Sequence, residues 1–249
     1  MKTTLNILPA AAAEQALHII REVDPEGASP RFISHEVLLA LLALQARLGT
    51  PWRFMPHKST LLARRRRWIE QGVFYALLSL SLAEPDEVSY VDCTFIECKS
   101  PHPERGWTKI GNGLKIQAIC RDDRQIVAAR VSCASPGEGR LLEALLREQP
   151  DLPIQWLVGD AAYDALRTRV LCTARGAHLI TTNDGPGRTT GSLDDPWERR
   201  AARHERGVIE RVFARLKDWR AVATCYCRSA ATYGAALALA VASLNGRLG

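Results

Sequence analysis

The sequence predicts an α/β fold, in which a small helical domain precedes a mixed five-stranded sheet flanked by helices. Residues 9–80 read as helices joined by turns, whereas segments rich in β-branched and aromatic residues begin only at Val88. From there strands and amphipathic helices alternate, as they do in sheets that are covered by helices. Because the linker Ala83-Glu84-Pro85-Asp86 separates the two patterns, we expect domains at residues 1–84 and 85–249.

The amino-terminal domain is expected to contain three helices. Its second helix has a suitable N-cap in Ser34 and a suitable stop in Gly49. An aromatic turn over residues 50–56 precedes the third helix, which gives the domain the character of a helix-turn-helix unit. The expected helices are 9–23, 34–49 and one continuous helix from about residue 59 to residue 80.

Positive charge is concentrated in two segments of the chain. The net charge is +6, and basic residues far outnumber acidic ones within residues 47–71 and 199–220. Such concentration suits a polyanion such as DNA better than an even scatter would. The first segment contains the consecutive residues Arg64, Arg65, Arg66 and Arg67. They are candidates for contacts to DNA phosphates, with a merely solvated basic helix as an equal alternative.

Composition indicates a globular protein without a membrane span. The 249 residues are 47% hydrophobic and 24% charged, which excludes extensive disorder. The longest apolar run, residues 230–244, is short for a bilayer and is better explained as a helix packed on the core. The seven cysteines are odd in number and form no C-x-x-C pair, so we expect reduced thiols, cytoplasmic localisation and no zinc finger.

The second domain is expected to contain five strands. The first three follow one another as a meander, and the fourth is more apolar, which favours a central position. The expected strands are 88–96, 114–120, 125–133, 155–160 and 177–182; the expected helices are 138–149, 164–175, 203–217 and 229–244, with a turn-rich loop over 183–196.

Three carboxylates stand at informative positions in this pattern. Asp92 lies inside the first strand, Asp160 ends the fourth strand, and Glu210 lies on a late helix. If the first and fourth strands are neighbours, the two aspartates converge. Converging carboxylates repel one another unless a divalent cation resides there, and oxygen-only ligands favour Mg²⁺ or Mn²⁺ over zinc. Two structural alternatives stay open: Asp160 caps the next helix, and Glu210 forms a weak surface ion pair with Arg206.

Several motifs resemble those of bacterial insertion-sequence transposases of the Asp-Asp-Glu (DDE) type. They are VDCTFIE, GLKI, LVGDAAYD and RGVIERVFARLK in the second domain, and ARLGTPWRFMP and RRRRWIEQGVF upstream. The resemblance extends from about Leu39 to the carboxyl terminus, and its third and fourth motifs are the most specific.

The resemblance implies a ribonuclease-H-like core whose catalytic, metal-ligating residues are Asp92, Asp160 and Glu210. It further implies two Mg²⁺ ions, with Mn²⁺ as a substitute, that act in cleaving the ends of a mobile element and joining the freed 3′-hydroxyl to target DNA. Double-stranded DNA is the implied partner, and a homodimer or higher assembly is expected because transposition joins two ends. The implied localisation is the bacterial cytoplasm, in association with the nucleoid.

The same resemblance suggests residues that hold DNA. The glutamate helix of this family commonly carries Tyr, Arg, Glu and Lys at set spacing. Here Arg206, Glu210 and Lys217 match, whereas Arg203 occupies the tyrosine position. We expect Arg203, Arg206 and Lys217 to hold the DNA backbone, and Lys115, on the second strand, is a further candidate.

Three other functions remain to be separated from transposition. A stand-alone nuclease with the same core would cut DNA without joining it. A catalytically silent, transposase-derived protein would bind DNA without cutting it. An unrelated α/β domain would hold the three carboxylates far apart.

Overall fold

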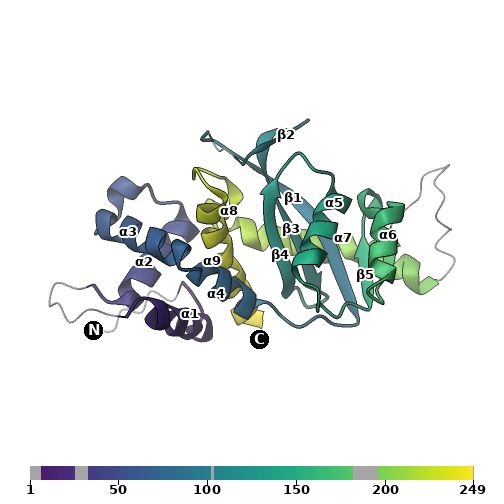
Figure 1. The fold of residues 1–249 in the computed structure, drawn as a ribbon, viewed down its shortest axis with the longest axis horizontal. Coiled ribbons are helices and arrows are strands. Elements are labelled where there is room, and N and C mark those ends of the chain that lie inside the picture. The colour runs from purple at the N-terminus through teal and green to yellow at the C-terminus, as the bar shows by residue number, and fades with distance from the viewer. Residues whose placement is uncertain (1–6, 26–32, 102–103, 182–195, 249) are drawn as a thin grey trace. The chain divides into compact units, whose positions relative to one another are not determined.

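The computed structural model describes residues 7–25, 33–101, 104–181 and 196–248, with the backbone alone for 196–206 and 247–248. The chain forms two compact units, whose elements are labelled in Figure 1. The sheet unit comprises Ala83–Glu97 and Glu104–Ala214, and the helical unit comprises Met1–Leu82, Cys98–Pro103 and Arg215–Gly249. The carboxyl-terminal segment therefore belongs to the helical unit, which a single boundary at residue 84 does not anticipate.

The helical unit is built from amino-terminal helices and a carboxyl-terminal helix that packs along them. The Ser34 hydroxyl accepts a hydrogen bond from the Val37 amide, and Gly49 ends the second helix in the left-handed conformation, as expected. No helix in the described part of the chain is long and apolar enough to cross a membrane. The elements are α1 (Ala10–Val23), α2 (His35–Leu48), η1 (Trp52–Phe54), α3 (Lys58–Glu70), α4 (Val73–Ser81), α8 (Arg220–Ala223) and α9 (Ala230–Leu248), with α9 in contact with α4.

The continuous third helix expected from the sequence is wrong, because the chain breaks it at Gly72. This residue has φ of 74° and precedes the first residue of α4. Left-handed backbone is readily accessible to glycine, since it lacks a Cβ atom. Two helices, α3 and α4, therefore replace one.

A buried aspartate joins three helices of this unit. Asp24, at the end of α1, accepts a hydrogen bond of 2.8 Å from the Trp68 indole and one from Arg64. Arg67 Nη2 lies 3.2 Å from Asp24 Oδ1, and His35 Nε2 lies 3.6 Å from Asp24 Oδ2. Burial alone would raise the pKa of Asp24, but these hydrogen bonds and the arginine charges outweigh it and hold the pKa below its ordinary value.

The sheet unit contains the mixed sheet expected from the sequence, with one short additional strand. The order is β2-β3-β1-β5-β6, with β4 also paired to β3. β1 pairs antiparallel with β3 and parallel with β5, so the first and fourth expected strands are neighbours. The strands are β1 (Val88–Glu97), β2 (Gly106–Thr108), β3 (Gly111–Arg121), β4 (Ile126–Cys133), β5 (Trp156–Gly159) and β6 (His178–Thr181).

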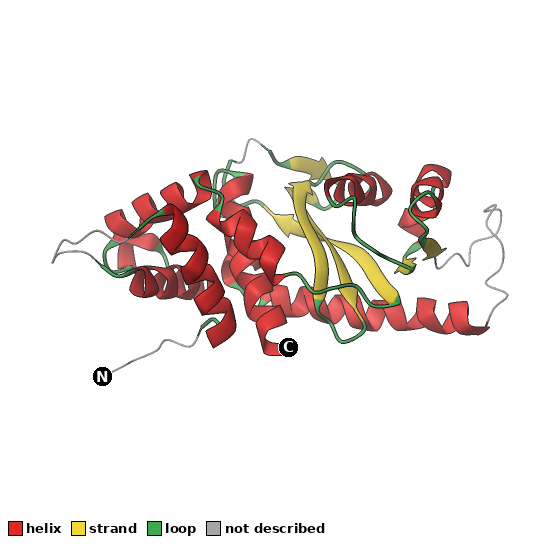
Figure 2. Cartoon of the chain, turned by 60° about the horizontal axis from the view of Figure 1, so that its bottom comes forward, coloured by secondary structure: helices red, strands yellow, loops and turns green. Residues whose placement is uncertain are grey.

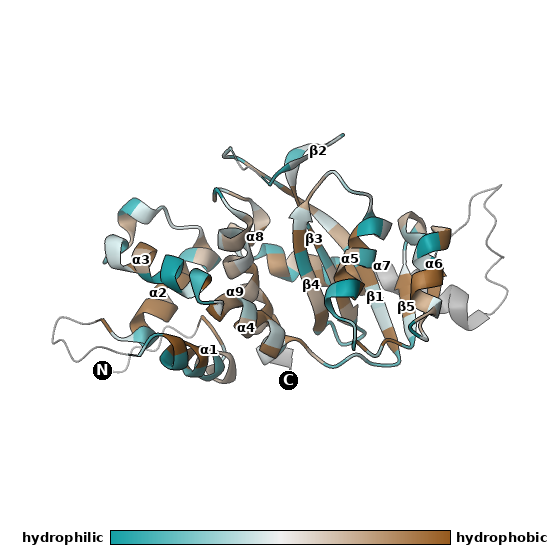
Figure 3. Cartoon of the chain, viewed as in Figure 1, coloured by the Kyte–Doolittle hydropathy of each residue, from teal (hydrophilic) through white to brown (hydrophobic). Residues whose placement is uncertain are grey.

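Helices lie on both faces of this sheet (Figures 1 and 2). α5 (Glu138–Glu148) covers one face, together with η2 (Ala161–Tyr163) and α6 (Leu166–Thr173), whereas α7 (Pro196–Lys217) runs along the other face. α5 alternates between hydrophilic and hydrophobic stretches in Figure 3, as an amphipathic helix does. The loop expected over residues 183–196 lies almost entirely outside the described residues.

The α5 face of the sheet carries a continuous apolar core. Val91 of β1 packs there with Leu142 and Leu145 of α5 and Leu157 of β5, all fully or nearly fully buried. Side chains alternate along a strand. Because Val91 points toward α5, its neighbour Asp92 projects from the face along which α7 runs.

Candidate metal centre

Parallel pairing of β1 and β5 brings the two aspartates together. The register matches Val91 with Gly159, so Asp92 and Asp160 are the next residues on each strand. β5 ends at Gly159, and Asp160 turns away from the sheet there. A Cβ atom on Gly159 would lie 2.8 Å from the Tyr163 ring, so only glycine allows this close approach of strand and turn. The convergence expected from the sequence is present.

A third carboxylate completes the cluster, and it is Glu138. Single oxygen atoms of Asp92, Glu138 and Asp160 all lie within 4.8 Å of one another, and all three residues are partly buried. Glu138 is the first residue of α5, directly after the turn that follows β4. An acidic residue at a helix start is usually explained by the helix dipole, so its sequence position did not distinguish it. The one feature of the sequence that could have identified Glu138 is its position shortly after the third strand of the meander.

Lys115 holds this glutamate in place. From the middle of β3, its Nζ atom lies 3.4 Å from Glu138 Oε1 and 3.3 Å from the Pro136 carbonyl oxygen. Burial raises the pKa of Glu138; the Lys115 charge opposes that rise, and Asp160 adds to it. Lys115, expected only as a DNA contact, therefore has a structural partner within the carboxylate cluster.

Asp92 is the least favourably placed charge in the cluster. Burial raises the pKa of its carboxyl from the ordinary 3.8 to about 7. The Cys93 amide, which donates a hydrogen bond of 2.6 Å to it, opposes the rise. The negative charges of Glu138, Asp160 and Glu210 add to the rise. The protein thus gathers several like charges around a partly buried carboxylate and does not neutralise them fully.

These donors fit a hard divalent cation. Three carboxylates supply oxygen ligands only, the set that Mg²⁺ and Mn²⁺ accept and that zinc sites seldom use alone. A cation there would relieve the repulsion that raises the pKa of Asp92. Within the described residues this is also the one acidic, cysteine or histidine group compact enough for a metal ion.

Glu210 stands beside the cluster without being part of its compact core. The glutamate is exposed on α7, and its oxygens are not within the group formed by Asp92, Glu138 and Asp160. Its charge nevertheless contributes to the raised pKa of Asp92, so it lies within electrostatic range. Its flanking residues Val208, Ile209 and Val212 are buried, which anchors this part of α7. The side chain of Arg206, its alternative partner, lies outside the described residues.

Asp160 also performs the structural role that the sequence left open. Its Oδ1 atom accepts a hydrogen bond of 2.8 Å from the Ala162 amide and so caps η2. One carboxylate oxygen thereby fixes the turn and the orientation of the side chain. Capping and metal binding are compatible, since a carboxylate has two oxygens and several lone pairs.

The four consecutive arginines of α3 all have partners within the protein. Arg64 and Arg67 contact Asp24, and Arg66 Nε lies 2.8 Å from Glu70. The Arg65 guanidinium lies 4.5 Å from the centre of the Trp52 ring. Arg66 and Arg67 remain 82% and 53% exposed, so these two have the most surface left for another ligand.

The expected DNA contacts on α7 are only partly described. The helical backbone includes Arg203 and Arg206, but their side chains lie outside the described residues. Lys217 is half-buried, and burial lowers its pKa.

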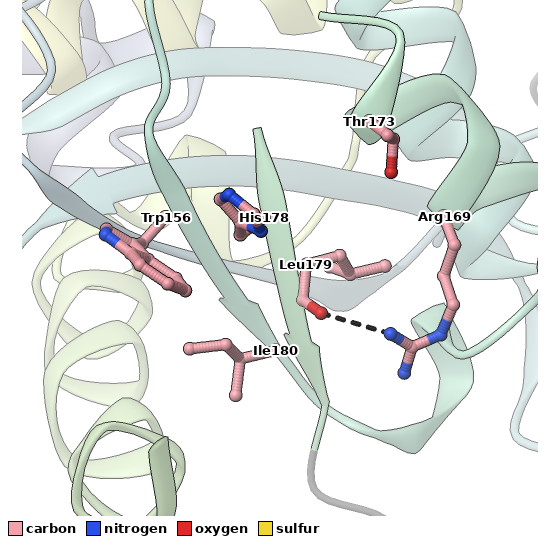
Figure 4. Close-up of a pocket in the computed structure, with 6 residues that line it drawn as sticks. All are labelled: Trp156, Arg169, Thr173, His178, Leu179 and Ile180. Atoms are coloured by element: carbon pink, nitrogen blue, oxygen red, sulfur yellow. Dashed lines mark hydrogen bonds between the residues drawn. The ribbon is translucent and has the colours of Figure 1, made fainter. Parts of the chain in front are cut away.

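A pocket of ≈ 310 Å³ is lined by residues of β5, α6 and β6, which are drawn in Figure 4. Trp156 and His178, the first residues of β5 and β6, stack there with ring centroids 4.6 Å apart. Arg169 donates to the Leu179 carbonyl, to Thr181 and to Asp164, so its guanidinium serves the fold. The carboxylates lie at the opposite ends of the strands, and none of the described residues that line this pocket is acidic.

Asp92 makes the stability of the metal-free protein depend on pH. Its pKa is about 7 when folded and near 3.8 when unfolded, so the folded state binds more protons between these values. The free energy of unfolding therefore falls as pH rises through this range, by at most about 4 kcal/mol. We expect Tm in a chelating buffer to fall between about pH 4 and about pH 7. Asp92→Asn should reduce that slope, leaving the contribution of Glu138, whose pKa is also raised, and the exposed control Asp151→Asn should keep the full slope. Equal slopes in both variants would contradict the assignment.

The sheet unit is thus an α/β domain with a cluster of three carboxylates whose oxygen atoms fit a divalent cation. A family model described as "Transposase DDE domain" matches residues 83–245, which include Asp92, Glu138, Asp160 and Glu210. The chain belongs to this family. The DDE-type transposase family that the sequence motifs resemble is confirmed by this match, and the expected mixed sheet flanked by helices is confirmed by the strand order.

Comparison with solved structures gave distant likenesses. The catalytic core domain of BIV integrase is 21% identical, with 64% of this chain and 82% of that chain covered and a TM-score of 0.39. The piggyBac transposase in a synaptic complex with hairpin DNA is 10% identical, with 96% and 64% covered and a TM-score of 0.48. A chain of the simian T-cell lymphotropic virus intasome bound to the PP2A regulatory subunit B56 gamma is 12% identical, with 54% and 39% covered and a TM-score of 0.34. A search of curated proteins gave no significant match.

Proposed function

We propose that this protein is a bacterial insertion-sequence transposase, which cleaves DNA at the ends of its element and joins the freed 3′-hydroxyl to target DNA. One observation carries the proposal: oxygens of Asp92, Glu138 and Asp160 lie within 4.8 Å of one another inside a DDE transposase domain. That arrangement suits divalent cations, and phosphodiester chemistry at neutral pH benefits from them.

Four carboxylates of the chain have distinct roles in this proposal. Asp92 and Asp160, fixed side by side by strand pairing, hold the cations, and Glu138 joins them from the start of α5. Glu210 completes the coordination from α7. Bound Mg²⁺ or Mn²⁺, two ions in this proposal, supplies Lewis acidity for the attacking and leaving oxygens. Attack by water and then by the freed 3′-hydroxyl requires no covalent bond between protein and DNA.

Basic residues position the DNA in this proposal. Arg203, Arg206 and Lys217 follow one stripe of α7 together with Glu210, and they hold backbone phosphates near the carboxylates. The helical unit binds the terminal repeats, with Arg66 and Arg67 as its most accessible arginines in α3. Two ends must be joined, so the protein acts as a dimer or a larger assembly, on the nucleoid in the cytoplasm.

Purified protein, labelled element-end DNA and a target plasmid test the proposal. Cleavage that requires Mg²⁺ or Mn²⁺, followed by joining to the plasmid, is the expected result. Cut ends that never join would indicate a nuclease with the same core. Tight, salt-sensitive binding without cleavage would indicate a silent DNA-binding protein.

The two glutamates are expected to differ in the absence of DNA. Glu138 lies in the compact cluster whereas Glu210 is exposed, so Glu138→Gln should weaken Mn²⁺ binding by about tenfold or more, and Glu210→Gln should weaken it less. Both variants should lose DNA cleavage. Isothermal titration with Mn²⁺ measures the first effect. Glu148→Gln, an exposed change in the same α5 helix, is the matched control. Unchanged Mn²⁺ affinity in the Glu138→Gln variant would show that Glu138 does not bind the metal.

A further inference from the structure

Three cysteines meet in the helical unit, apart from the carboxylate cluster. Cys225 and Cys227 lie in the connection between α8 and α9, and their sulfur atoms are 3.3 Å apart. Cys98 forms an isolated parallel bridge with Cys225, and their side chains are hydrogen-bonded. The Lys99 amide donates a hydrogen bond of 2.9 Å to the Cys225 carbonyl. The backbone thus holds these thiols together.

The two closest thiols differ in environment. Cys225 is fully buried, whereas Cys227 is partly exposed. Their mutual hydrogen bond raises the pKa of Cys225 and lowers that of Cys227, which the Arg65 guanidinium lowers further. Cys227 is therefore the sulfur that more readily becomes a thiolate, the reactive form of cysteine.

We propose that Cys225 and Cys227 form a peroxide-reactive dithiol, in which Cys227 is oxidised first and Cys225 resolves the product. The Cys227 thiolate attacks hydrogen peroxide; a sulfur–oxygen bond forms, the peroxide O–O bond breaks, and hydroxide leaves. The Cys225 thiol then attacks the Cys227 sulfenic acid, so that a disulfide forms and water leaves. Two thiols lose two electrons in total, and one peroxide becomes two waters.

The geometry favours this reaction over metal binding. A disulfide requires sulfur atoms about 2.0 Å apart, so the pair must close by roughly 1 Å from its present separation. Within the described residues, the three sulfurs do not form a group compact enough to hold a metal ion. The other candidate partner for Cys225 is Cys98, which makes the pairing itself the point to test.

Trypsin should release both cysteines in the single peptide 221–228, which follows Arg220 and ends at Arg228. After treatment of the full chain with hydrogen peroxide, mass spectrometry should show this peptide with two hydrogens fewer. Cys133, a partly exposed thiol on β4, is the internal reference, and it should oxidise at least tenfold more slowly.

Three variants assign the roles. Cys227→Ser should prevent oxidation of the peptide, whereas Cys225→Ser should leave a sulfenic acid on Cys227 that dimedone traps. Cys133→Ser should change neither result, and circular dichroism checks that each variant is folded. A Cys98–Cys225 disulfide, oxidation no faster than that of Cys133, or zinc retained by the purified reduced protein would each overturn the proposal. None of these readouts depends on DNA cleavage.

Discussion

Asp92→Asn is expected to reduce metal-dependent cleavage of element-end DNA at least about a thousandfold, which corresponds to roughly 4 kcal/mol of transition-state stabilisation. Asp92 is one of the three clustered carboxylates, and the charges of Glu138, Asp160 and Glu210 all act on it. Asparagine has the same shape, but it removes the negative charge that a cation needs. Rates of cleavage at saturating Mg²⁺ measure the effect.

The same change should not unfold the protein. Burial and like charges disfavour the ionised Asp92 carboxylate, so the asparagine variant should be at least as stable as the wild type without metal. It should also still bind DNA, because the basic residues are untouched. Asp151→Asn, an exposed carboxylate of the sheet unit, is the matched control. Cleavage by the Asp92→Asn variant at the wild-type rate would contradict the proposed mechanism.

Asp24→Asn is expected to lower the free energy of unfolding of the helical unit by about 3 kcal/mol. The Asp24 carboxylate is buried, and it is the shared partner of Arg64, Arg67 and the Trp68 indole. Removing its charge leaves two arginines without their anion. The cost lies at the lower end of the range for a broken buried pair, because Arg64 is 21% and Arg67 53% exposed and water replaces part of the interaction.

Hydrogen exchange of the α3 amides measures this loss within the helical unit alone. Glu70→Gln breaks the exposed Arg66–Glu70 pair in the same helix and should cost no more than about 0.5 kcal/mol. Equal effects of the two substitutions would show that Asp24 does not organise the helices.

The sheet and its two aspartates could be predicted because local patterns specify them. β-branched residues mark β1, alternation marks β3, and an apolar run marks β5; once these strands are neighbours, Asp92 and Asp160 must converge. The meander of β1, β3 and β4 followed for the same reason. The expected metal followed from the chemistry of these ligands, since carboxylates offer only oxygen atoms.

Glu138, Gly72 and Asp24 could not be predicted in the same way. Glu138 depends on how the turn after β4 folds back toward β3, where Lys115 meets it. Glycine can adopt either the right-handed or the left-handed helical conformation, so the residue type of Gly72 does not by itself show that the helix breaks there. The sequence shows Asp24 only as the end of a helix, and the packing of the helices is needed to see that it engages Arg64. Each depends on contacts between residues distant along the chain.

Pairing between β1 and β5 also determines when the site appears during synthesis. β1, β3 and β4 are close in sequence and can associate as soon as residues 88–133 have left the ribosome. That early sheet carries Asp92 but has neither Glu138 nor Asp160. The carboxylates gather only after β5 docks, and α7 brings Glu210 later still. A chain that ends before β5 therefore lacks Asp160, and the complete carboxylate cluster forms only in the finished domain.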